Sequence, residues 1–402
     1  MAGLEVEKVL LSVFININVM DEKIETRKIL ERAKEGEEIS SQEAILLLHS
    51  RDLESLLDLK HTADLLRRRQ VGDTVSFVIN RNINFTNICE QHCNFCAFRR
   101  DSGEEGSFFL ESEEILSKAR SAVSKGATEI CMQGGLNPQA KLGGKSLNYY
   151  LNLVSTIKDH YPQLHLHAFS PQEIEFIARE DGITYKDVLI ELKEAGLDSL
   201  PGTAAEVLSE RVRKIICPEK INSQIWLEII ALAHSLGLHT TSTMLCGHVE
   251  TVQEQIEHLE QIRTLQKRAI KQNYPAKITE FILLPFVGQN APSMLRKRVG
   301  RDQPCLEDTM ILTAVARIYL GAVIPNQQPS WVKLGFNGAL GALEWGCNDL
   351  GGTLMEEHIT SMAGAIGGGC LEVEQLQMGI VSTGRSYRQR TTLYDDALSS
   401  PG

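Results

Sequence analysis

The pattern of hydrophobic and polar positions divides the chain into two parts. Over residues 1–72, leucines recur at helical spacing among Glu, Lys and Arg, as in SSQEAILLLHSRDLESLLDLKHTADLLRRR. Ser40 or Ser41 can cap a helix there, because Glu43 follows within the first turn. We therefore predict an N-terminal helical extension over residues 1–72.

From Ser76 onward, short β-branched or apolar runs alternate with helical segments. The runs lie at 76–85, 128–135, 164–170, 197–202, 239–247, 277–286 and, with a weaker pattern, at 322–335 and 348–354. Helical segments lie between them, such as INSQIWLEIIALAHSLG, which ends at Gly237. A strand–helix–strand alternation repeated six to eight times predicts a parallel sheet.

A closed barrel and an open doubly wound sheet both contain such a sheet. No GxGxxG motif follows the first run, and polar or glycine residues end nearly every run. This distribution favours an α/β fold of the TIM type, a (βα) barrel of six to eight parallel strands whose site forms at the C-terminal strand ends. We assign residues 73–385 to the barrel and residues 386–402 to a polar C-terminal tail that frays.

Composition narrows the possible partners and the compartment. The chain has 402 residues, 41 basic against 52 acidic residues and a formal charge of −11. No block of like charges suggests nucleic acid or an anionic membrane as a partner. No apolar run approaches the roughly 18 residues that span a bilayer, and nine scattered cysteines are an unsuitable number for a disulfide framework. We expect a cytoplasmic protein that binds a small, specific ligand.

Three of the nine cysteines are concentrated in TNICEQHCNFCAFRR, directly after the first predicted strand. Cys89, Cys93 and Cys96 have the spacing C-x3-C-x2-C. Buried structural thiols and a zinc site are the simpler alternatives, but structural zinc uses four ligands, usually in two separated pairs. No second CxxC exists, and His92 adjoins Cys93 too closely to reach the same ion easily. In a [4Fe–4S] cluster, three thiolates would leave one iron open to a small molecule.

Other predicted strand ends carry candidate binding or catalytic groups. These are Gln133, Gly134, Gly135, Ser170, Glu206, Arg213, His248 and Glu250. Paired glycines let an amino acid ammonium or carboxylate approach the backbone, although they also form ordinary turns. A histidine beside a carboxylate is a reasonable acid–base or substrate-orienting pair, and a buried structural histidine is the alternative. Glu206 can equally cap a helix, and Arg213 can equally lie on the surface.

The cysteine spacing, with Phe95 before the third cysteine, resembles the signature of the radical S-adenosylmethionine (radical SAM) enzymes. The resemblance implies that Cys89, Cys93 and Cys96 bind a [4Fe–4S] cluster whose open iron chelates SAM. An electron from the cluster then cleaves SAM to a 5′-deoxyadenosyl radical. The resemblance also suggests cofactor-binding roles for Phe95, Gln133, Gly134, Gly135, Ser170, Glu206 and Arg213. We assign His248 and Glu250 as the catalytic pair.

A wider set of segments resembles the deazaflavin (FO) synthase family. They are NRNINFTNICEQHCNFCAF, ICMQGGLNP, HAFSPQEI, DSLPGTAAEVL, MLCGHVET, FILLPFVGQNAPS and NDLGGTLMEE, which span roughly residues 80–357. This resemblance implies that L-tyrosine is cleaved between Cα and Cβ. The resulting 4-hydroxybenzyl radical is added to 5-amino-6-(D-ribitylamino)uracil, a step towards FO, the deazaflavin precursor of coenzyme F420.

Because the chain has only one cysteine triplet, the resemblance also implies a second radical SAM subunit and an external low-potential electron donor. Two alternatives stay open from the sequence. One is a radical SAM enzyme of the futalosine route to menaquinone, whose relatives share the cysteine loop. The other is a non-catalytic iron–sulfur or zinc protein that uses a barrel as a scaffold.

Overall fold

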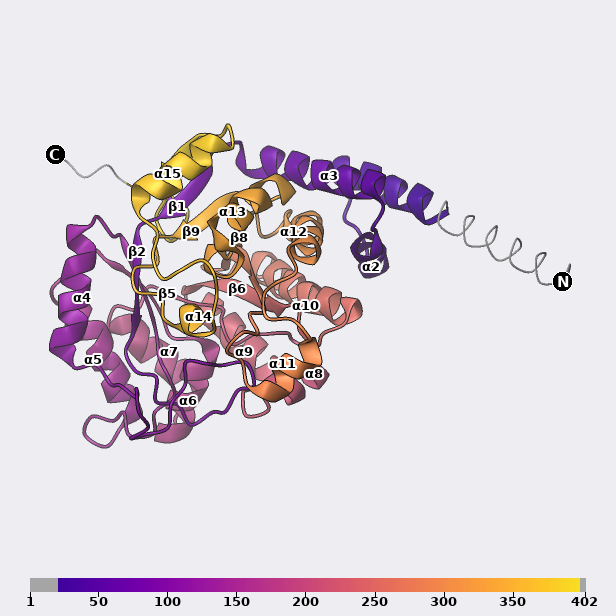
Figure 1. The fold of residues 1–402 in the computed structure, drawn as a ribbon. Helices are drawn as coiled ribbons and strands as arrows, with labels where there is room; N and C mark the ends of the chain where they lie inside the picture. Colours follow the sequence, from indigo (N-terminus) through magenta and orange to yellow (C-terminus); the bar gives the residue numbers. More distant parts are fainter. Residues whose placement is uncertain (1–20, 398–402) are drawn as a thin grey trace, which may run out of the picture.

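The computed structural model describes residues 21–397, and helices open this part of the chain (Figure 1). Residues 21–34 are helical, followed by α2 (Ser41–His49) and α3 (Leu53–Val71). Ser40 is the cap of α2, because its hydroxyl accepts the N–H of Glu43 and the Glu43 carboxylate accepts the N–H of Ser40. The predicted capping box is therefore confirmed. Residues 1–20 of the predicted extension lie outside the described part.

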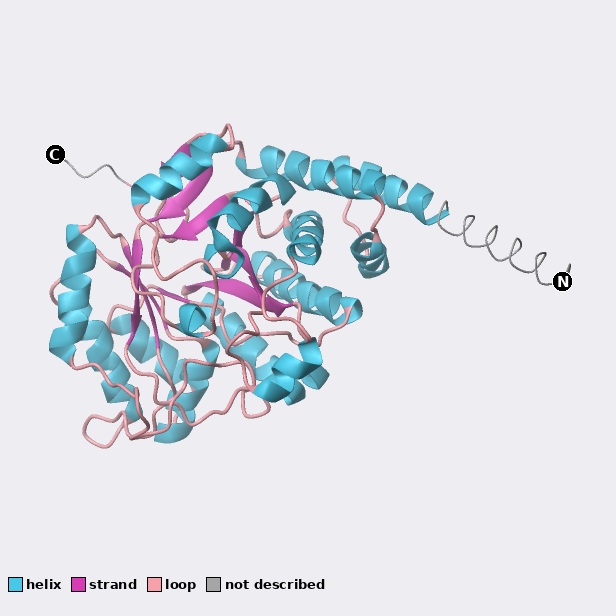
Figure 2. Ribbon diagram, in the orientation of Figure 1, coloured by secondary structure: helices cyan, strands magenta, loops and turns pink. Residues whose placement is uncertain are grey.

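Seven strands of the described chain form one parallel sheet; all strands, including those of a second, smaller sheet, are magenta in Figure 2. The seven strands are β2 (Asn80–Asn84), β3 (Glu129–Gln133), β4 (His165–Ala168), β5 (Ser199–Leu200), β6 (His239–Cys246), β7 (Ile278–Pro285) and β8 (Asn326–Pro329). Neighbours in the sheet follow chain order from β2 to β8, as repeated strand–helix–strand units require. The predicted parallel barrel of six to eight strands is confirmed by this sheet.

The first predicted run, 76–85, is divided between two sheets. Its second half is β2, whereas its first half is β1 (Val75–Val78), the central strand of a smaller sheet between β9 (Asp349–Gly352) and β10 (Tyr387–Gln389). The chain after β9 then returns to β2, where Met355 accepts a main-chain hydrogen bond at 3.0 Å from Asn82. This second sheet therefore lies across the gap between the first and last strands of the large one.

Most of the helices after β2 pack around the outside of the large sheet, whereas the helix at 359–362 lies at the mouth of the barrel and the helix at 373–382 contacts β10 (Figure 1). The helices after β2 are α4 (Ser112–Ser124), α5 (Ser146–Lys158), α6 (Pro171–Asp181), α7 (Tyr185–Glu194), α8 (Glu210–Ile216), α9 (Ser223–Ser235), α10 (Val252–Lys271), α11 (Ser293–Val299), α12 (Leu306–Leu320), α13 (Trp331–Ala342), the 3-10 helix η1 (Leu343–Trp345), α14 (Ile359–Met362) and α15 (Val373–Ser382). Gly237, with φ of 86°, follows α9 as predicted. Among the described residues, no helix combines the length and apolar character needed to cross a membrane.

The prediction that the C-terminal tail frays is wrong for residues 386–397. Tyr387–Gln389 pairs in parallel with β1, and the Arg390 side chain is buried. The Arg390 guanidinium donates to the Asp349 carboxylate at 3.0 Å and to Glu280 at 3.3 Å. The segment is polar because these charges pair inside the barrel, and its composition therefore conceals its burial. Residues 398–402 lie outside the described part.

Candidate functional site

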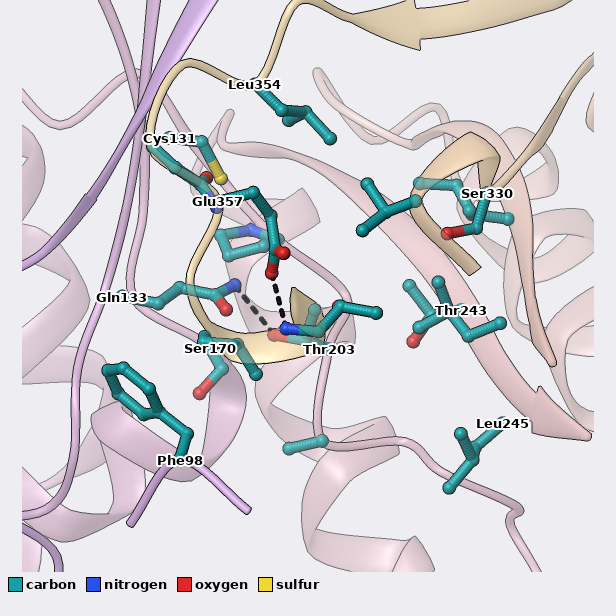
Figure 3. Close-up of a pocket in the computed structure, with 18 of the residues that line it drawn as sticks. Phe98, Cys131, Gln133, Ser170, Thr203, Thr243, Leu245, Ser330, Leu354 and Glu357 are labelled. Atoms are coloured by element: carbon teal, nitrogen blue, oxygen red, sulfur yellow. Dashed lines mark hydrogen bonds between the residues drawn. The ribbon is translucent and has the colours of Figure 1, made fainter. Parts of the chain in front are cut away.

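A cavity of about 390 Å³ lies inside the barrel at the C-terminal ends of its strands (Figure 3). Segments after β2, β3, β4, β5, β7, β8 and β9 form its rim, and inward-facing strand residues form its deeper walls. Cys89, Cys93 and Cys96, from the cysteine loop (residues 86–100), all line it. The cavity therefore occupies the place where a barrel of this type carries its active site.

Main-chain hydrogen bonds fix the cysteine loop. The N–H of Cys89 donates to the carbonyl of Arg100 at 3.2 Å, and the N–H of Arg100 donates to the carbonyl of Asn87 at 2.8 Å. The N–H of Asn94 reaches the carbonyl of Ile216 at 2.7 Å, which ties the loop to α8. The loop therefore presents its thiols to the cavity from a backbone that is already ordered.

The three thiols fit an iron–sulfur cluster better than zinc. Cys93 is buried, Cys89 and Cys96 are half-buried, and none of them forms a disulfide. Within residues 21–397, no three His, Cys, Asp or Glu side chains are spaced to hold a single metal ion. The thiolates of a cluster bind different irons and need not converge on one point. Nothing in this geometry supplies the four convergent ligands of structural zinc.

Lys220 brings a positive charge to the cysteine loop. Its ammonium lies 5.4 Å from the centre of the Phe95 ring and 2.7 Å from the Glu206 carboxylate. Burial raises the pKa of the Cys93 and Cys89 thiols, and the Lys220 charge offsets part of that rise. Because iron binds the thiolate, this cation favours the form of the cysteines that can bind a cluster.

The glycine pair after β3 lets two loops meet. A Cβ atom on Gly135 would lie 2.2 Å from the carbonyl oxygen of Ile88 and 3.0 Å from Cβ of Cys89. A Cβ on Gly134 would lie 2.5 Å from the Phe85 ring. The preceding Gln133 points into the cavity, where its amide donates to the hydroxyl of Thr203 at 2.9 Å (Figure 3). Packing against the cysteine loop therefore requires glycine at 135, and packing against the Phe85 ring requires it at 134, whatever else the pair binds.

We expect Gly135→Ala to displace the cysteine loop, because the carbonyl of Ile88 is backbone that cannot rotate away. Overpacking of this kind costs about 1–3 kcal/mol, so iron content should fall and SAM affinity should drop about tenfold or more. Iron analysis and equilibrium binding of SAM measure both effects. Gly341→Ala is the control, because no atom lies within 4 Å of the added Cβ. Normal iron content and SAM affinity in Gly135→Ala would contradict this account.

Ser170 caps α6, and this cap connects two strand ends. The Ser170 hydroxyl accepts the N–H of Glu173 at 3.3 Å, and the Glu173 carboxylate accepts the N–H of Ser170 at 2.6 Å. The same carboxylate accepts the N–H of Gly134 at 3.1 Å. Burial raises the pKa of Glu173 to about 7, although its hydrogen bonds favour the charged form. Glu173 was not anticipated from the sequence, and it lines the cavity together with Ser170.

The pKa of Glu173 predicts a pH dependence of stability. The folded protein holds this proton up to a pH of about 7, whereas the unfolded chain releases it near the ordinary carboxyl pKa of 4.5. Stability should therefore fall as the pH rises from about 4.5 to 7, by up to ~3 kcal/mol from this one group. Glu173→Gln keeps the cap but cannot titrate, so urea unfolding should show a weaker decline across this range than in the wild type. Identical pH profiles would exclude Glu173 as a source.

Glu206 and Arg213 occupy different environments. Glu206 lies in the loop before α8, where its own φ is 48°. Its side chain lines the cavity and pairs with Lys220. Arg213 lies on α8, outside the residues that line this cavity, and its guanidinium donates to the carbonyls of Ala205 at 2.6 Å and Ala204 at 3.3 Å. Arg213 thus holds the loop that carries Glu206, and Lys220, which pairs with Glu206, lines the cavity.

His248 and Glu250 lie at a second cavity, of about 230 Å³, behind the end of β6. Their side chains approach each other at 3.1 Å, and the Glu250 carboxylate also accepts the N–H of His248 at 2.9 Å. Neither residue lines the larger cavity that holds the cysteines. The structure therefore separates the predicted catalytic pair from the cysteine loop, and the pair holds its own turn together.

Comparisons with known proteins agree with this geometry. A model of the radical SAM superfamily matches residues 83–262, and a model of the CofH/MqnC C-terminal region matches residues 278–399. A 5-amino-6-(D-ribitylamino)uracil–L-tyrosine 4-hydroxyphenyl transferase of Nostoc punctiforme is 65% identical, over 94% of this chain and 99% of its own. One of the same name from Microcystis aeruginosa is 65% identical, over 91% of this chain and 97% of its own.

Solved structures share the fold at much lower identity. Methylornithine synthase aligns with a TM-score of 0.69 and 16% identity, over 89% of this chain and 97% of that one. The hydrogenase maturase HydG aligns with a TM-score of 0.71 and 14% identity, over 92% of this chain and 76% of that one. With the cysteine loop in place at the barrel mouth and relatives matched over nearly their full length, the chain belongs to the radical SAM superfamily, in the family of the 5-amino-6-(D-ribitylamino)uracil–L-tyrosine 4-hydroxyphenyl transferases.

Proposed function

We propose that this protein transfers the 4-hydroxybenzyl group of L-tyrosine to 5-amino-6-(D-ribitylamino)uracil, as a radical SAM transferase in the formation of FO. The observation that carries the proposal is the cysteine loop, whose three thiols line one barrel cavity in a chain 65% identical to transferases of that name. The futalosine alternative is not favoured, because relatives at 59–65% identity over at least 89% of this chain carry the transferase name.

Residues of this chain account for how the cofactors would be held. Cys89, Cys93 and Cys96 would bind the [4Fe–4S] cluster, which with SAM supplies a radical that abstracts hydrogen from a substrate. Gln133 and Ser170 line the adjoining wall, and we retain them as candidates for binding SAM. Lys220 adds a fixed positive charge on the same side. Our proposal for SAM binding therefore includes Lys220 in place of Arg213.

The deeper cavity suits a polar substrate held away from water. Ile282, Leu284 and Phe286 contribute apolar walls, which would exclude water from a radical. Asn82 and Gln328 line the same space, and their side chains make no hydrogen bond to other residues of the described chain. Free amide groups in a largely apolar cavity are the kind of donors and acceptors that the hydroxyls of a ribityl chain require.

The test is an anaerobic reaction of the iron-reconstituted protein with SAM, a low-potential reductant, tyrosine and the ribitylaminouracil. Mass spectrometry should detect 5′-deoxyadenosine and a hydroxybenzyl–uracil adduct together. Formation of 5′-deoxyadenosine without the adduct would overturn the proposed substrates and leave the radical chemistry. Neither product from a sample with an intact cluster would instead support a scaffold role.

Two partners belong to the proposal. A second radical SAM subunit would convert the adduct to FO, because this chain has one cysteine triplet and so one cluster of this kind. An external low-potential donor would deliver the electron. A cytoplasmic location is consistent with this chemistry, since all nine cysteines are free thiols.

A further inference from the structure

Four cations line the large cavity, and three of them are already paired with carboxylates. Lys220 pairs with Glu206 at 2.7 Å, Arg390 pairs with Asp349 and Glu280, and Arg99 pairs with Asp101. The fourth is Lys333. Within residues 21–397, no carboxylate oxygen lies within 4.0 Å of its ammonium, and its side chain donates no hydrogen bond.

The backbone that carries Lys333 is held firmly. Lys333 lies in the first turn of α13, where its N–H donates to the carbonyl of Ser330 at 3.1 Å. Trp331, two residues before Lys333, is 1% exposed, and its indole N–H donates to the carbonyl of Gly352 at 3.0 Å. The turn ends at Gly335, whose φ of 71° interrupts the helix. The ammonium is therefore presented to the cavity from a fixed point between β8 and β9.

A carboxylate shares the cavity with Lys333 but does not neutralise it. Glu357 is 6% exposed and accepts the N–H groups of Thr360 at 2.7 Å and Ser361 at 3.1 Å. Figure 3 shows its side chain pointing into the cavity, with the bond to the backbone dashed. Burial lowers the pKa of Lys333, and the Glu357 charge offsets part of that decrease. The unpaired ammonium of Lys333 and the carboxylate of Glu357 thus line the same cavity.

The two cavity lysines act on different thiols. The charge of Lys220 acts on Cys89 and Cys93 in the cysteine loop. The charge of Lys333 acts on Cys246 at the end of β6, whose pKa is raised by burial. The charge of Glu206, the partner of Lys220, also acts on Lys333, so the two lysines share one cavity. They enter it from different segments, because Lys220 follows α8 beside the cysteine loop and Lys333 lies in α13 between β8 and β9.

We propose that Lys333 binds the α-carboxylate of an amino acid in this cavity and that Glu357 accepts a hydrogen bond from its ammonium group. A desolvated cation gains most from an anionic ligand, and a nearby carboxylate complements the positive end of a zwitterion. The proposal rests on the proposed function, in which the amino acids are tyrosine and the methionyl group of SAM. We assign the site to tyrosine, because Lys220 already serves the side of the cavity that contains the cysteines.

The test compares binding to the iron-reconstituted protein without reductant, so that no turnover occurs. We expect Lys333→Met to weaken tyrosine binding about 10- to 100-fold, the loss typical of a hydrogen bond between charged groups. Its affinity for tyramine, which lacks the carboxylate, should be unchanged, and so should its affinity for SAM. Lys297→Met on α11 is the matched control, since Lys297 is exposed and does not line the cavity.

The wild-type protein gives an independent measurement if Lys333→Met does not fold. Tyramine and tyrosine amide should bind the wild type at least tenfold more weakly than tyrosine does. A loss of SAM affinity with tyrosine affinity retained would overturn the assignment to tyrosine, because the carboxylate held by Lys333 would then be that of SAM. Unchanged affinity for both amino acids in Lys333→Met would overturn the inference and leave the proposed function intact. Absence of any tyrosine binding by the wild type would overturn both.

Discussion

Cys96→Ala is expected to abolish the iron–sulfur cluster and all reductant-dependent release of 5′-deoxyadenosine. Cys96 is one of only three thiols that the cysteine loop offers to the cavity, and its N–H is fixed to the carbonyl of Cys93 at 3.1 Å. With two thiolates left, one more iron loses its protein ligand, and the cluster should not survive reconstitution. The measurements are iron and sulfide content, the visible absorption of the cluster and 5′-deoxyadenosine formed per chain.

Cys370→Ala is the matched control for this variant. Cys370 is exposed and lies outside the cavity, so the same substitution there should leave cluster content and SAM cleavage at wild-type values. The far-ultraviolet circular dichroism of the apo forms should coincide for the two variants and the wild type. If Cys96→Ala retained its cluster and cleaved SAM, the assignment of the cysteine loop would be wrong.

The barrel and the cysteine loop could be predicted from the sequence because their signals are local. Each strand of the large sheet lies within one of the predicted runs, although the segments that form β2 and β8 are themselves polar, and Cys89, Cys93 and Cys96 lie within eight residues. The glycine pair after β3 can also be recognised in the sequence as a candidate site. In the structure, the backbone of the cysteine loop lies so close to Gly135 that no larger residue fits there. Local patterns of this kind depend on neighbours in the chain, and the sequence displays those directly.

The rest of the site depends on contacts between distant segments. Lys220 lies beside Phe95 of the cysteine loop, although it follows Cys96 by 124 residues in the chain. Likewise, the Glu173 carboxylate accepts the N–H of Gly134, 39 residues earlier. Conversely, His248 and Glu250 follow the end of β6, but the turn directs both of them to a second cavity. A position directly after a strand thus predicts that a residue lies at the C-terminal end of the barrel. It does not predict the cavity into which the side chain points.

The polar composition of the C-terminal segment conceals a buried ion pair that we expect to contribute strongly to stability. Arg390 is 2% exposed and lies against Asp349, which is fully buried. We expect Arg390→Met to destabilise the protein by about 3–5 kcal/mol, because it leaves the Asp349 charge buried without its partner. Urea unfolding of the apo protein measures this loss as a decrease in the free energy of unfolding.

Two comparisons distinguish the buried ion pair from a general effect of the substitution. Arg388→Met, two residues earlier, removes an exposed pair with Asp396 and should cost at most about 1 kcal/mol. Adding Asp349→Asn to Arg390→Met removes the unpaired charge and should recover part of the lost stability, as buried pairs replaced on both sides do. Equal losses for the two arginine variants would mean that the segment contributes through its backbone alone. A larger loss for Arg390→Met, with recovery in the double variant, would mean that the buried charges hold the C-terminal segment in the barrel, beneath the cavity that Arg390 lines.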